Sequence, residues 1–434
     1  MRNGAAWKKR IGYALLSVVT AWQTLAGHDL TTADLRPRLI VETDAGGDPD
    51  DEATLERLLM FSNQFELEVI IDDRSNSQIE SRSTYQTEVK NAGGDGEDLV
   101  EKYIRDYGDL HANLSLHADG YPTEAKLKAI TVAGHEGTNA GRDAIIAAVD
   151  ADDPRPVWYG NWGSNSGTTS NLKRALDHVQ AARTQAEYEE FASRLRICSL
   201  DGNTGTRQGH IDVIKLHIET GYPDISGRWY HQFQPITQTA GGFDINRDVR
   251  NNHGTLGAHY TTQKEGDSWC IVHLQNQAVG LAVPTRVRWG GWGGRYAGLR
   301  SGVNFPNNAF YWNDQADTWA GSTNRNNTAA RFADDMQHHF AARFDWGQAA
   351  VYADANHAPA AVVNGDSSGA VVRLFAVPGQ QVALSAAGSS DPDGDSIAYE
   401  WIRYDEADSY SGSVSISGAT TRDAIVSIPG DAGG

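Results

Sequence analysis

The chain has 434 residues, of which 40% are hydrophobic and 21% charged, so we expect a folded protein with one large and one smaller domain. It carries 37 Lys and Arg against 56 Asp and Glu, a formal net charge of −19. This balance argues against a nucleic-acid partner, because phosphate binding needs a basic face.

The first 26 residues have the pattern of a secretory signal peptide. Residues 2–10 contain four positive charges, residues 11–19 form an apolar run, and the small residues Thr24 and Ala26 precede a plausible cleavage point. The apolar run is shorter than the ~20 residues that a membrane span requires. We therefore expect a secreted or periplasmic protein without a membrane anchor.

The next part of the chain alternates strand and helix patterns, which predicts an α/β fold with a mainly parallel sheet and flanking helices over residues 36–350. Strands are expected at 38–43, 65–72, 156–162 and 195–200, and helices at 50–61, 142–149, 170–179, 187–194 and 331–344. From about 225 to 323 the chain is rich in Gly, Asn and Trp, which predicts long loops that carry function.

A linker near residues 356–359 precedes a β-rich segment. Strands are expected at 371–376, 381–386, 396–403, 413–416 and 424–428. This pattern predicts an immunoglobulin-like β-sandwich over 358–434 with Trp401 in its core, and its five strands are fewer than the usual seven or so. We expect an incomplete sandwich.

The two cysteines, Cys198 and Cys270, each lie in an apolar run and match no zinc or redox spacing. Buried free thiols are the preferred interpretation. A disulfide is the alternative in an exported protein, because the sequence does not give the distance between the two residues.

The strongest chemical signal is the segment ETDAGGDPDD at residues 42–51, between a predicted strand and a predicted helix. Ligands of open α/β sheets bind at this edge, and a helix N-terminus offsets part of the repulsion between carboxylates. A helix cap needs only one or two acids. The excess of carboxylates favours a hard cation with oxygen ligands, calcium or magnesium.

This segment resembles the signature of nucleoside hydrolases, and its longer form TDAGGDPDD resembles a secreted bacterial branch described as nucleoside-hydrolase-like and cellulose-binding. The segments at 158–172 (WYGNWGSNSGTTSNL), 252–257 (NHGTLG), 265–268 (EGDS), 289–296 (WGGWGGRY) and 389–396 (SSDPDGDS) also resemble motifs of that branch. The resemblance covers most of the chain after residue 26.

The resemblance implies roles for four aspartates and one turn. Asp44 matches the residue that touches calcium and activates water, and Asp51 and Asp267 match calcium ligands. Asp50 matches the residue that holds sugar hydroxyls. The turn at 164–167, where Asn165 is a candidate substrate contact, matches a segment that adds a carbonyl ligand.

Two departures from the family pattern affect the expected site. Asp48 lies in an insertion and is a further candidate metal ligand. Gly266 stands where many nucleoside hydrolases have a histidine that protonates the leaving base. His253 is therefore the candidate replacement acid, with a structural histidine as the alternative reading.

The glycine-rich segment 289–296 predicts a loop that contacts substrate. We expect Trp289 and Trp292 to be exposed and to stack on a sugar ring or a base, with plain packing as the alternative. Arg295 and Tyr296 are candidate donors to sugar hydroxyls.

Two functions fit these features. The first is a secreted, calcium-dependent hydrolase of N-glycosyl or glycosyl compounds associated with cellulose or a related polysaccharide. The alternative is a non-catalytic cellulose- or polysaccharide-binding protein that retains a nucleoside-hydrolase-like pocket. The sequence leaves the oligomeric state open.

Overall fold

The structure is a computed structural model, in which the described residues are 10–11, 36–47, 49–92, 98–135, 137–163, 171–199, 241–260, 265–300 and 311–432. The predicted signal peptide lies outside them except for β1 (Arg10–Ile11). None of the helices in these ranges combines the length and the hydropathy that a membrane span requires.

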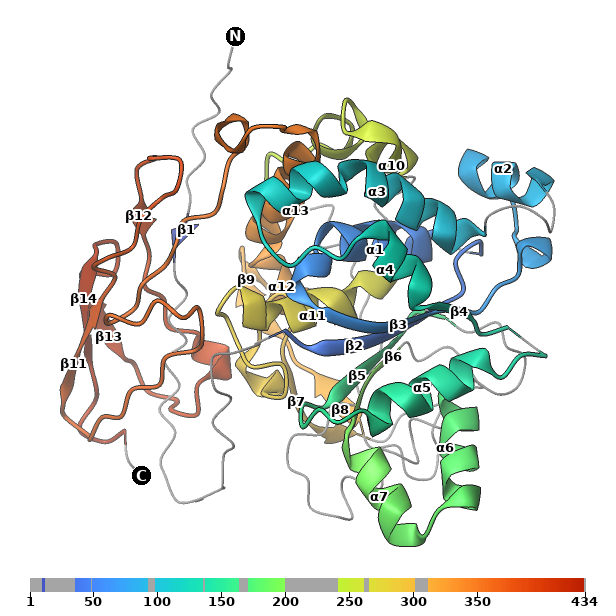
Figure 1. The fold of residues 1–434 in the computed structure, drawn as a ribbon. Helices are drawn as coiled ribbons and strands as arrows, with labels where there is room; N and C mark the ends of the chain where they lie inside the picture. The colour runs from blue at the N-terminus through green and yellow to red at the C-terminus, as the bar shows by residue number, and fades with distance from the viewer. Residues whose placement is uncertain are drawn as a thin grey trace.

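A five-stranded parallel sheet forms the centre of the larger domain, in the order β4-β3-β2-β5-β6 (Figure 1). Its strands are β2 (Arg38–Thr43), β3 (Glu66–Asp72), β4 (Thr131–Ala133), β5 (Val157–Asn161) and β6 (Leu195–Ser199). The apolar runs of β2, β3 and β5 are buried on both faces, as parallel sheets covered by helices require. The predicted parallel α/β fold is confirmed.

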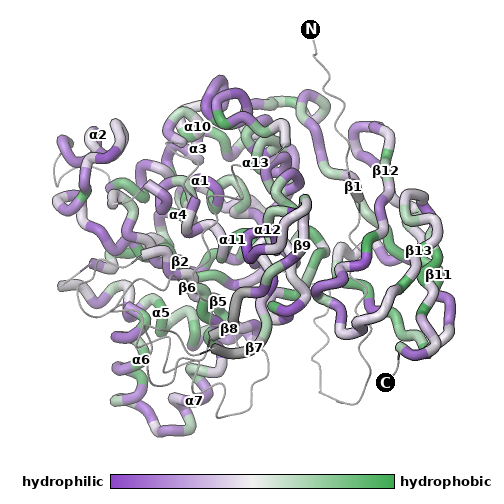
Figure 2. Tube along the Cα trace, turned by 180° about the vertical axis from the view of Figure 1, so that it is seen from behind, coloured by the Kyte–Doolittle hydropathy of each residue, from purple (hydrophilic) through white to green (hydrophobic). Residues whose placement is uncertain are grey.

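Helices cover both faces of the sheet (Figure 1). One layer contains α1 (Asp50–Met60), α3 (Leu99–His117), α11 (Trp269–Ala278) and α13 (Ala333–Gln348), and its apolar residues share one core with the sheet. The other layer contains α5 (Ala140–Asp150), α6 (Asn171–Ala182) and α7 (Gln185–Ser193), which pack on a second core. Figure 2 shows the hydrophobic residues concentrated in the central strands and the inner helix faces.

Shorter elements connect these layers. They are η1 (Ser62–Gln64), η2 (Asn76–Gln78), α2 (Thr84–Ala92), α4 (Glu124–Ala129), η3 (Asn246–Arg250), α10 (Gly254–His259), η4 (Gly266–Ser268), η5 (Val287–Trp289), β7 (Tyr296–Arg300), β8 (Tyr311–Asp314), β9 (Asp317–Trp319), β10 (Ser322–Asn324), α12 (Asn327–Ala330) and η6 (Tyr352–Asp354). The β9–β10 pair is an antiparallel hairpin, and β7 pairs antiparallel with β8.

The C-terminal part is a small antiparallel β domain. β11 (Gln381–Ser385), β13 (Ser415–Ser417) and β14 (Asp423–Ser427) form a sheet in the order β11-β14-β13. β12 (Ala398–Tyr399) pairs in parallel with β1. Trp401 lies in the core as predicted, 5% exposed, and its indole N–H donates to the Thr421 carbonyl at 2.8 Å.

The strand predicted at 371–376 is wrong. The structure has no strand in this described segment, and Phe375 is 92% exposed. The alternating apolar pattern is typical of a strand, but a strand also needs a neighbour to accept its backbone hydrogen bonds, and no backbone pairing forms along 371–376.

Cys198 and Cys270 form a disulfide, so the preferred interpretation as free thiols is wrong, although both residues are buried as predicted. Cys198 lies in β6 and Cys270 is the second residue of α11, which packs on that face of the sheet. This packing brings two Cα atoms 72 residues apart in sequence to 5.7 Å, within the range that a disulfide can bridge.

Candidate metal centre

The acidic turn leaves β2 at the carboxyl edge of the sheet. β3 and β4 extend the sheet on one side of β2, whereas β5 and β6 extend it on the other. The chain after β2 therefore lies at the point where the strand order reverses, which is the usual ligand site in open α/β sheets. Gly46, with φ +99°, turns the backbone, and α1 begins at Asp50 directly after Pro49.

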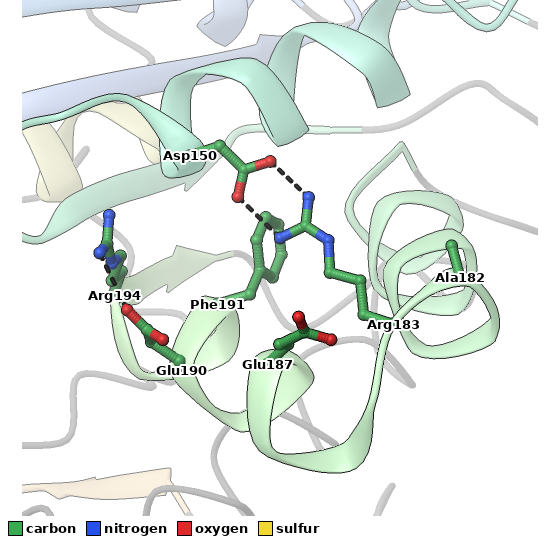
Figure 3. A pocket seen from close by; sticks show the side chains of 7 residues that line it. All are labelled: Asp150, Ala182, Arg183, Glu187, Glu190, Phe191 and Arg194. Atoms are coloured by element: carbon green, nitrogen blue, oxygen red, sulfur yellow. Dashed lines mark hydrogen bonds and ion pairs between the residues drawn. The ribbon is translucent and has the colours of Figure 1, made fainter.

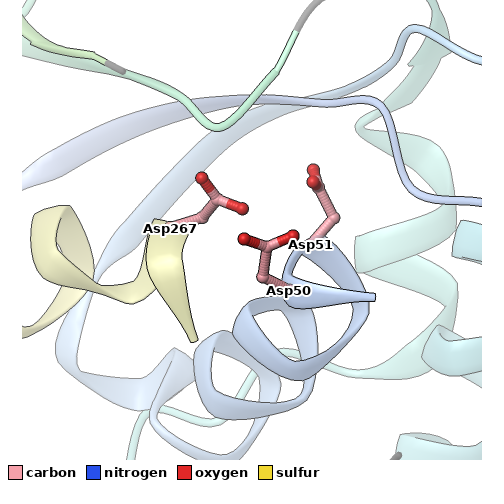
Figure 4. Close-up of side chains that lie close together, drawn as sticks. All are labelled: Asp50, Asp51 and Asp267. Atoms are coloured by element: carbon pink, nitrogen blue, oxygen red, sulfur yellow. The ribbon is translucent and has the colours of Figure 1, made fainter. Parts of the chain in front are cut away.

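Three carboxylates meet at this edge. Ligand oxygens of Asp50, Asp51 and Asp267 lie within 4.8 Å of one another (Figure 4). Asp50 and Asp51 begin α1, and Asp267 comes from η4, more than two hundred residues later. Thr54 contacts Ser268 at 2.9 Å between hydroxyl oxygens, and this contact holds η4 against α1.

A buried ion pair fixes the same junction one turn further along α1. The Arg57 guanidinium donates to both Glu265 oxygens, at 2.5 and 2.9 Å, and to the Gln337 side chain of α13 at 2.7 Å. Arg57 and Glu265 are almost completely buried. Because Glu265 is two residues before Asp267, this pair sets the position of the third carboxylate.

The three carboxylates are electrostatically crowded. Burial raises the pKa of Asp50 to about 6, and the neighbouring Asp44 carboxylate adds to this shift. Burial is also the main cause that raises the pKa of Asp51 and of Asp267 well above the ordinary value, followed by the charges of the other aspartates. Each group therefore resists ionisation as long as no cation compensates it.

The donor set fits a hard divalent cation. Asp51 is 3% and Asp267 1% exposed, and Oδ1 of Asp267 has no hydrogen-bond partner within the described part of the chain. A buried carboxylate oxygen without a partner is costly, and a cation would remove that cost. Oxygen-only ligands suit calcium or magnesium better than zinc.

Asp44 lies beside this cluster, and its carboxylate is held by Arg74. The Arg74 guanidinium donates to Asp44 Oδ2 at 2.8 Å and to the Asp44 carbonyl at 2.9 Å. The Asp44 N–H donates to Asp51 Oδ1 at 3.2 Å. A Cβ on Gly163, two residues after the end of β5, would lie 1.8 Å from Asp44 Oδ1, so only glycine allows this approach.

A buried polar network lies under the turn. Glu42, the fifth residue of β2, accepts hydrogen bonds from the Tyr159 hydroxyl and, at 3.3 Å, from the Asn171 amide. Burial raises the pKa of Glu42 to about 8, and the charge of Asp73 adds to the shift. Asn171 also donates to the Gly134 carbonyl at 2.9 Å, which links the ends of three strands beneath the carboxylates.

The structure does not bring His253 to the aspartates. Its Nε2 contacts Asp345 Oδ1 at 3.0 Å, and its ring packs on Phe344. Both partners lie on the part of α13 that packs beyond the C-terminal end of α1, where Phe340 stacks on Phe61. The predicted replacement acid is thus at the opposite end of α1 from Asp50 and Asp51.

The 289–296 segment is packed rather than open. The prediction that Trp292 is exposed is wrong, because it is 3% exposed and its backbone N–H donates to Asn276 at 2.8 Å. Tyr296 is buried as well, and its hydroxyl donates to the Gly293 carbonyl at 3.1 Å. Trp289 is half-buried, with the Arg373 guanidinium 5.5 Å from its ring centre.

Arg295 belongs to a buried contact between the two domains. It pairs with Asp317 of β9 at 2.7 Å, and Asp317 also accepts from the Tyr404 hydroxyl of the C-terminal domain. Arg331 bridges Asp317 and Glu406 at 3.3 and 3.2 Å. These contacts place Arg295 in the domain interface. Trp292, Arg295 and Tyr296 are all buried, so none of them has the exposed side chain that its predicted contact with substrate requires.

Two predicted site residues, Asp48 and Asn165, lie outside the described residues, as does the rest of the 164–167 turn. Arg74 is a site residue that the sequence reasoning missed. Its position in the sequence is the signal: it lies two residues after the end of β3, and the carboxyl ends of neighbouring parallel strands meet at one edge.

A hollow lies at the opposite edge of the sheet, between the end of α5 and helices α6 and α7 (Figure 3). Its charges pair with one another: Arg183 with Asp150 and Arg194 with Glu190 at 3.1 Å. This hollow lies where α5 and α7 lead into the amino ends of β5 and β6, away from the aspartates, so we do not assign it to the candidate site.

Comparisons with known proteins agree with this architecture. Residues 38–296 match the family model described as cellulose-binding Sde182, nucleoside hydrolase-like domain, and residues 381–433 match the model of the cellulose-binding protein Sde0182, C-terminal domain. No curated protein matches the sequence.

A solved structure shares the fold over most of both chains. It is described as a nucleoside hydrolase-related hypothetical protein from Saccharophagus degradans that is associated with carbohydrate metabolism. It is 34% identical to this chain, with a TM-score of 0.71, and the match covers 91% of this chain and 92% of that one. The chain therefore belongs to the cellulose-binding protein family with a nucleoside-hydrolase-like domain.

Proposed function

We propose that the protein is an exported, calcium-dependent hydrolase of N-glycosyl or glycosyl bonds that works on or near cellulose or a related polysaccharide. The observation that carries the proposal is the convergence of Asp50, Asp51 and Asp267 within 4.8 Å, with a buried and unpartnered oxygen on Asp267. A packed protein keeps such a cluster only where something compensates its charge.

Asp51 and Asp267 would hold the cation together with Asp50, which was predicted as a sugar contact, and Asp44, predicted as both metal contact and base, would act as the general base beside them. When bound, calcium would supply electrophilic assistance to a water and to sugar hydroxyls. Arg74 occupies Asp44 Oδ2, so Asp44 Oδ1 is the oxygen left to accept a proton from the attacking water. Arg74 thereby fixes the orientation of the base, as partners of general bases do in other enzymes.

The described part of the site contains no histidine beside Asp267 that could protonate a leaving group, because residue 266 is Gly and His253 is engaged by Asp345. Purine nucleosides, whose bases depart best when protonated, should therefore be poor substrates. Glycosides with leaving groups that need no such proton are the class that this arrangement favours.

The alternative function is a non-catalytic cellulose-binding protein. The specific observation in its favour is the Arg74–Asp44 ion pair at 2.8 Å, since it engages one carboxylate oxygen of the only proposed base. The family description, cellulose-binding, supports binding in both alternatives.

One experiment separates the two functions. The full chain is assayed with calcium against a panel of nucleosides, aryl glycosides and cello-oligosaccharides, beside Asp44→Asn. Turnover by the unmutated protein that falls about 10²–10⁴-fold in the variant would support the hydrolase, because asparagine keeps the shape but accepts no proton. No turnover on any substrate, with calcium binding intact, would favour the binding protein, and rapid inosine hydrolysis would refute the leaving-group argument.

A further inference from the structure

A chain of hydrogen bonds joins the two domains through two buried histidines. His117, the last residue of α3, contacts the Ala349 carbonyl through Nε2 at 2.9 Å. Its Nδ1 lies 2.9 Å from Nε2 of His357 in the linker. His357 Nδ1 in turn lies 2.9 Å from Oδ1 of Asp393, in the Asp-rich turn of the C-terminal domain. The two histidines are 7% and 3% exposed.

The partners at the two ends of this chain of hydrogen bonds determine how many protons the two histidines hold. A backbone carbonyl accepts and does not donate, so His117 Nε2 must carry a proton. Asp393 also accepts the His357 backbone N–H at 2.6 Å, so it acts as a carboxylate and His357 Nδ1 must carry a proton as well. If both rings were neutral, the two inner nitrogens would be two lone pairs 2.9 Å apart. If both rings were imidazolium, the inner nitrogens would be two facing N–H groups.

A single additional proton between the rings satisfies every partner. His357 lies next to the Asp393 carboxylate, and the Tyr352 ring stacks on it at 3.8 Å between centroids. The Trp346 ring packs against both histidines, with its centroid 5.4 Å from His117 and 5.1 Å from His357, and the Arg343 guanidinium lies 4.0 Å from its centre. Burial lowers the pKa of His117, and the charges of His357 and Arg343 lower it further.

We propose that His117, His357 and Asp393 form a pH-dependent contact, here called the clasp. The clasp docks the linker and the Asp-rich turn onto the larger domain only while the histidine pair holds one positive charge. Asp393 balances that charge, and Asp391, in the same turn, adds to the negative potential at Tyr352. The clasp is independent of the aspartate cluster and of the proposed hydrolase activity.

The sign of the pH dependence follows from proton linkage. When the turn is not docked, both histidines have the ordinary pKa of about 6.5. At that pH the pair then carries on average one positive charge. The docked pair holds one. Above pH 6.5 the docked state binds more protons than the released state, and below it fewer, so docking is strongest near pH 6.5 and weakens on both sides. The limiting slope is about tenfold per pH unit.

The experiment is amide hydrogen exchange of the full chain between pH 5 and 9, corrected for intrinsic exchange, followed over residues 350–357 and 389–396. We expect protection to be greatest near pH 6.5 and to fall by about 20-fold between pH 7 and 8.5. In His117→Asn the amide can donate to a neutral His357 or accept from a charged one, so the fall above pH 7 should disappear. His111→Asn, on the same helix and outside the clasp, is the matched control and should keep it.

Nitrogen-15 NMR of histidine-labelled, unmutated protein measures the proton count directly and does not depend on any variant folding. At pH 7 we expect one of the two rings to be imidazolium and the other to be neutral. Two neutral rings at pH 7 with both segments still protected, or protection that is independent of pH, would overturn the proposal.

Discussion

Asp267→Asn should have opposite effects on stability with and without calcium. At 4.8 Å, two full charges repel by about 3 kcal/mol at an effective dielectric constant near 20, and Asp267 faces two such neighbours. The raised pKa values of Asp51 and Asp267 mean that part of this repulsion is relieved by proton uptake. In chelator we therefore expect the variant to be more stable by about 1–2 kcal/mol, a part of this pairwise repulsion.

The pH dependence of this gain has a definite sign. A carboxyl whose folded-state pKa is raised contributes stability below its ordinary pKa of about 3.9 and loses it as the pH rises. Asparagine resembles the protonated acid, so the two proteins should be equally stable near pH 4, and the advantage of the variant should grow toward pH 8.

Calcium should reverse the order. If calcium binds as proposed, at about a hundred times its dissociation constant it should stabilise the unmutated fold by about 2.7 kcal/mol. The variant lacks one charged ligand and should gain much less, so it becomes the less stable protein. Thermal melting with chelator and with calcium measures both effects, and Asp143→Asn, an exposed acid on α5, is the control that should change neither. A variant that melts below the unmutated protein in chelator, or an unmutated protein that does not respond to calcium, would refute the reasoning.

Three further predictions follow from other parts of the structure. Trp319, 38% exposed on the β9–β10 hairpin, should contribute to sedimentation with insoluble cellulose, so Trp319→Ala should weaken it while Trp319→Phe retains most of it. Equal binding by all three proteins would exclude this ring. Cys198→Ser should lower the free energy of unfolding by about 4 kcal/mol because the disulfide closes a 72-residue separation, measured by denaturant titration. Glu56 is buried with its pKa raised, and neither carboxylate oxygen has a partner in the described structure. Glu56→Leu should therefore raise the free energy of unfolding by about 1–3 kcal/mol at pH 8 and change it little at pH 4. A lower free energy of unfolding at pH 8 would contradict this.

The first strand, the acidic turn and the helix after it could be predicted because their signals are local. A short apolar run, a glycine-containing turn and helical periodicity all lie within residues 38–60, and the structure follows them within one residue. The convergence of Asp267 with Asp50 was implied by family resemblance alone. Its physical cause, the buried pair of Arg57 with Glu265, lies in two segments whose sequences contain no sign of each other.

The errors share a different cause. The disulfide depends on the distance between a strand and a helix 72 residues apart, which no spacing rule gives. His253 was selected because it lies in a loop-rich region with a suitable side chain, but a loop position does not say which end of α1 the loop reaches. Arg74 was missed because the aspartates drew attention to one strand end, although the neighbouring strand ends at the same edge.

The glycines of the 289–296 segment explain why its tryptophans were assigned to substrate. Glycine-rich loops often approach ligands closely, but here they approach protein. A Cβ on Gly290 would lie 2.6 Å from Tyr404 of the C-terminal domain, and one on Gly291 would lie 2.4 Å from Asn276 of α11. Both glycines have positive φ, which side chains disfavour.

The 289–296 segment is therefore packed between α11 and the C-terminal domain. There Arg295 forms the buried ion pair with Asp317. Substitutions in it should disturb domain docking before they affect any ligand, so a loss of cellulose binding in such variants would not locate the binding surface. Trp319 is the better probe, because its exposed ring lies on a hairpin that Asn327 anchors through three backbone carbonyls and that a side-chain truncation leaves in place.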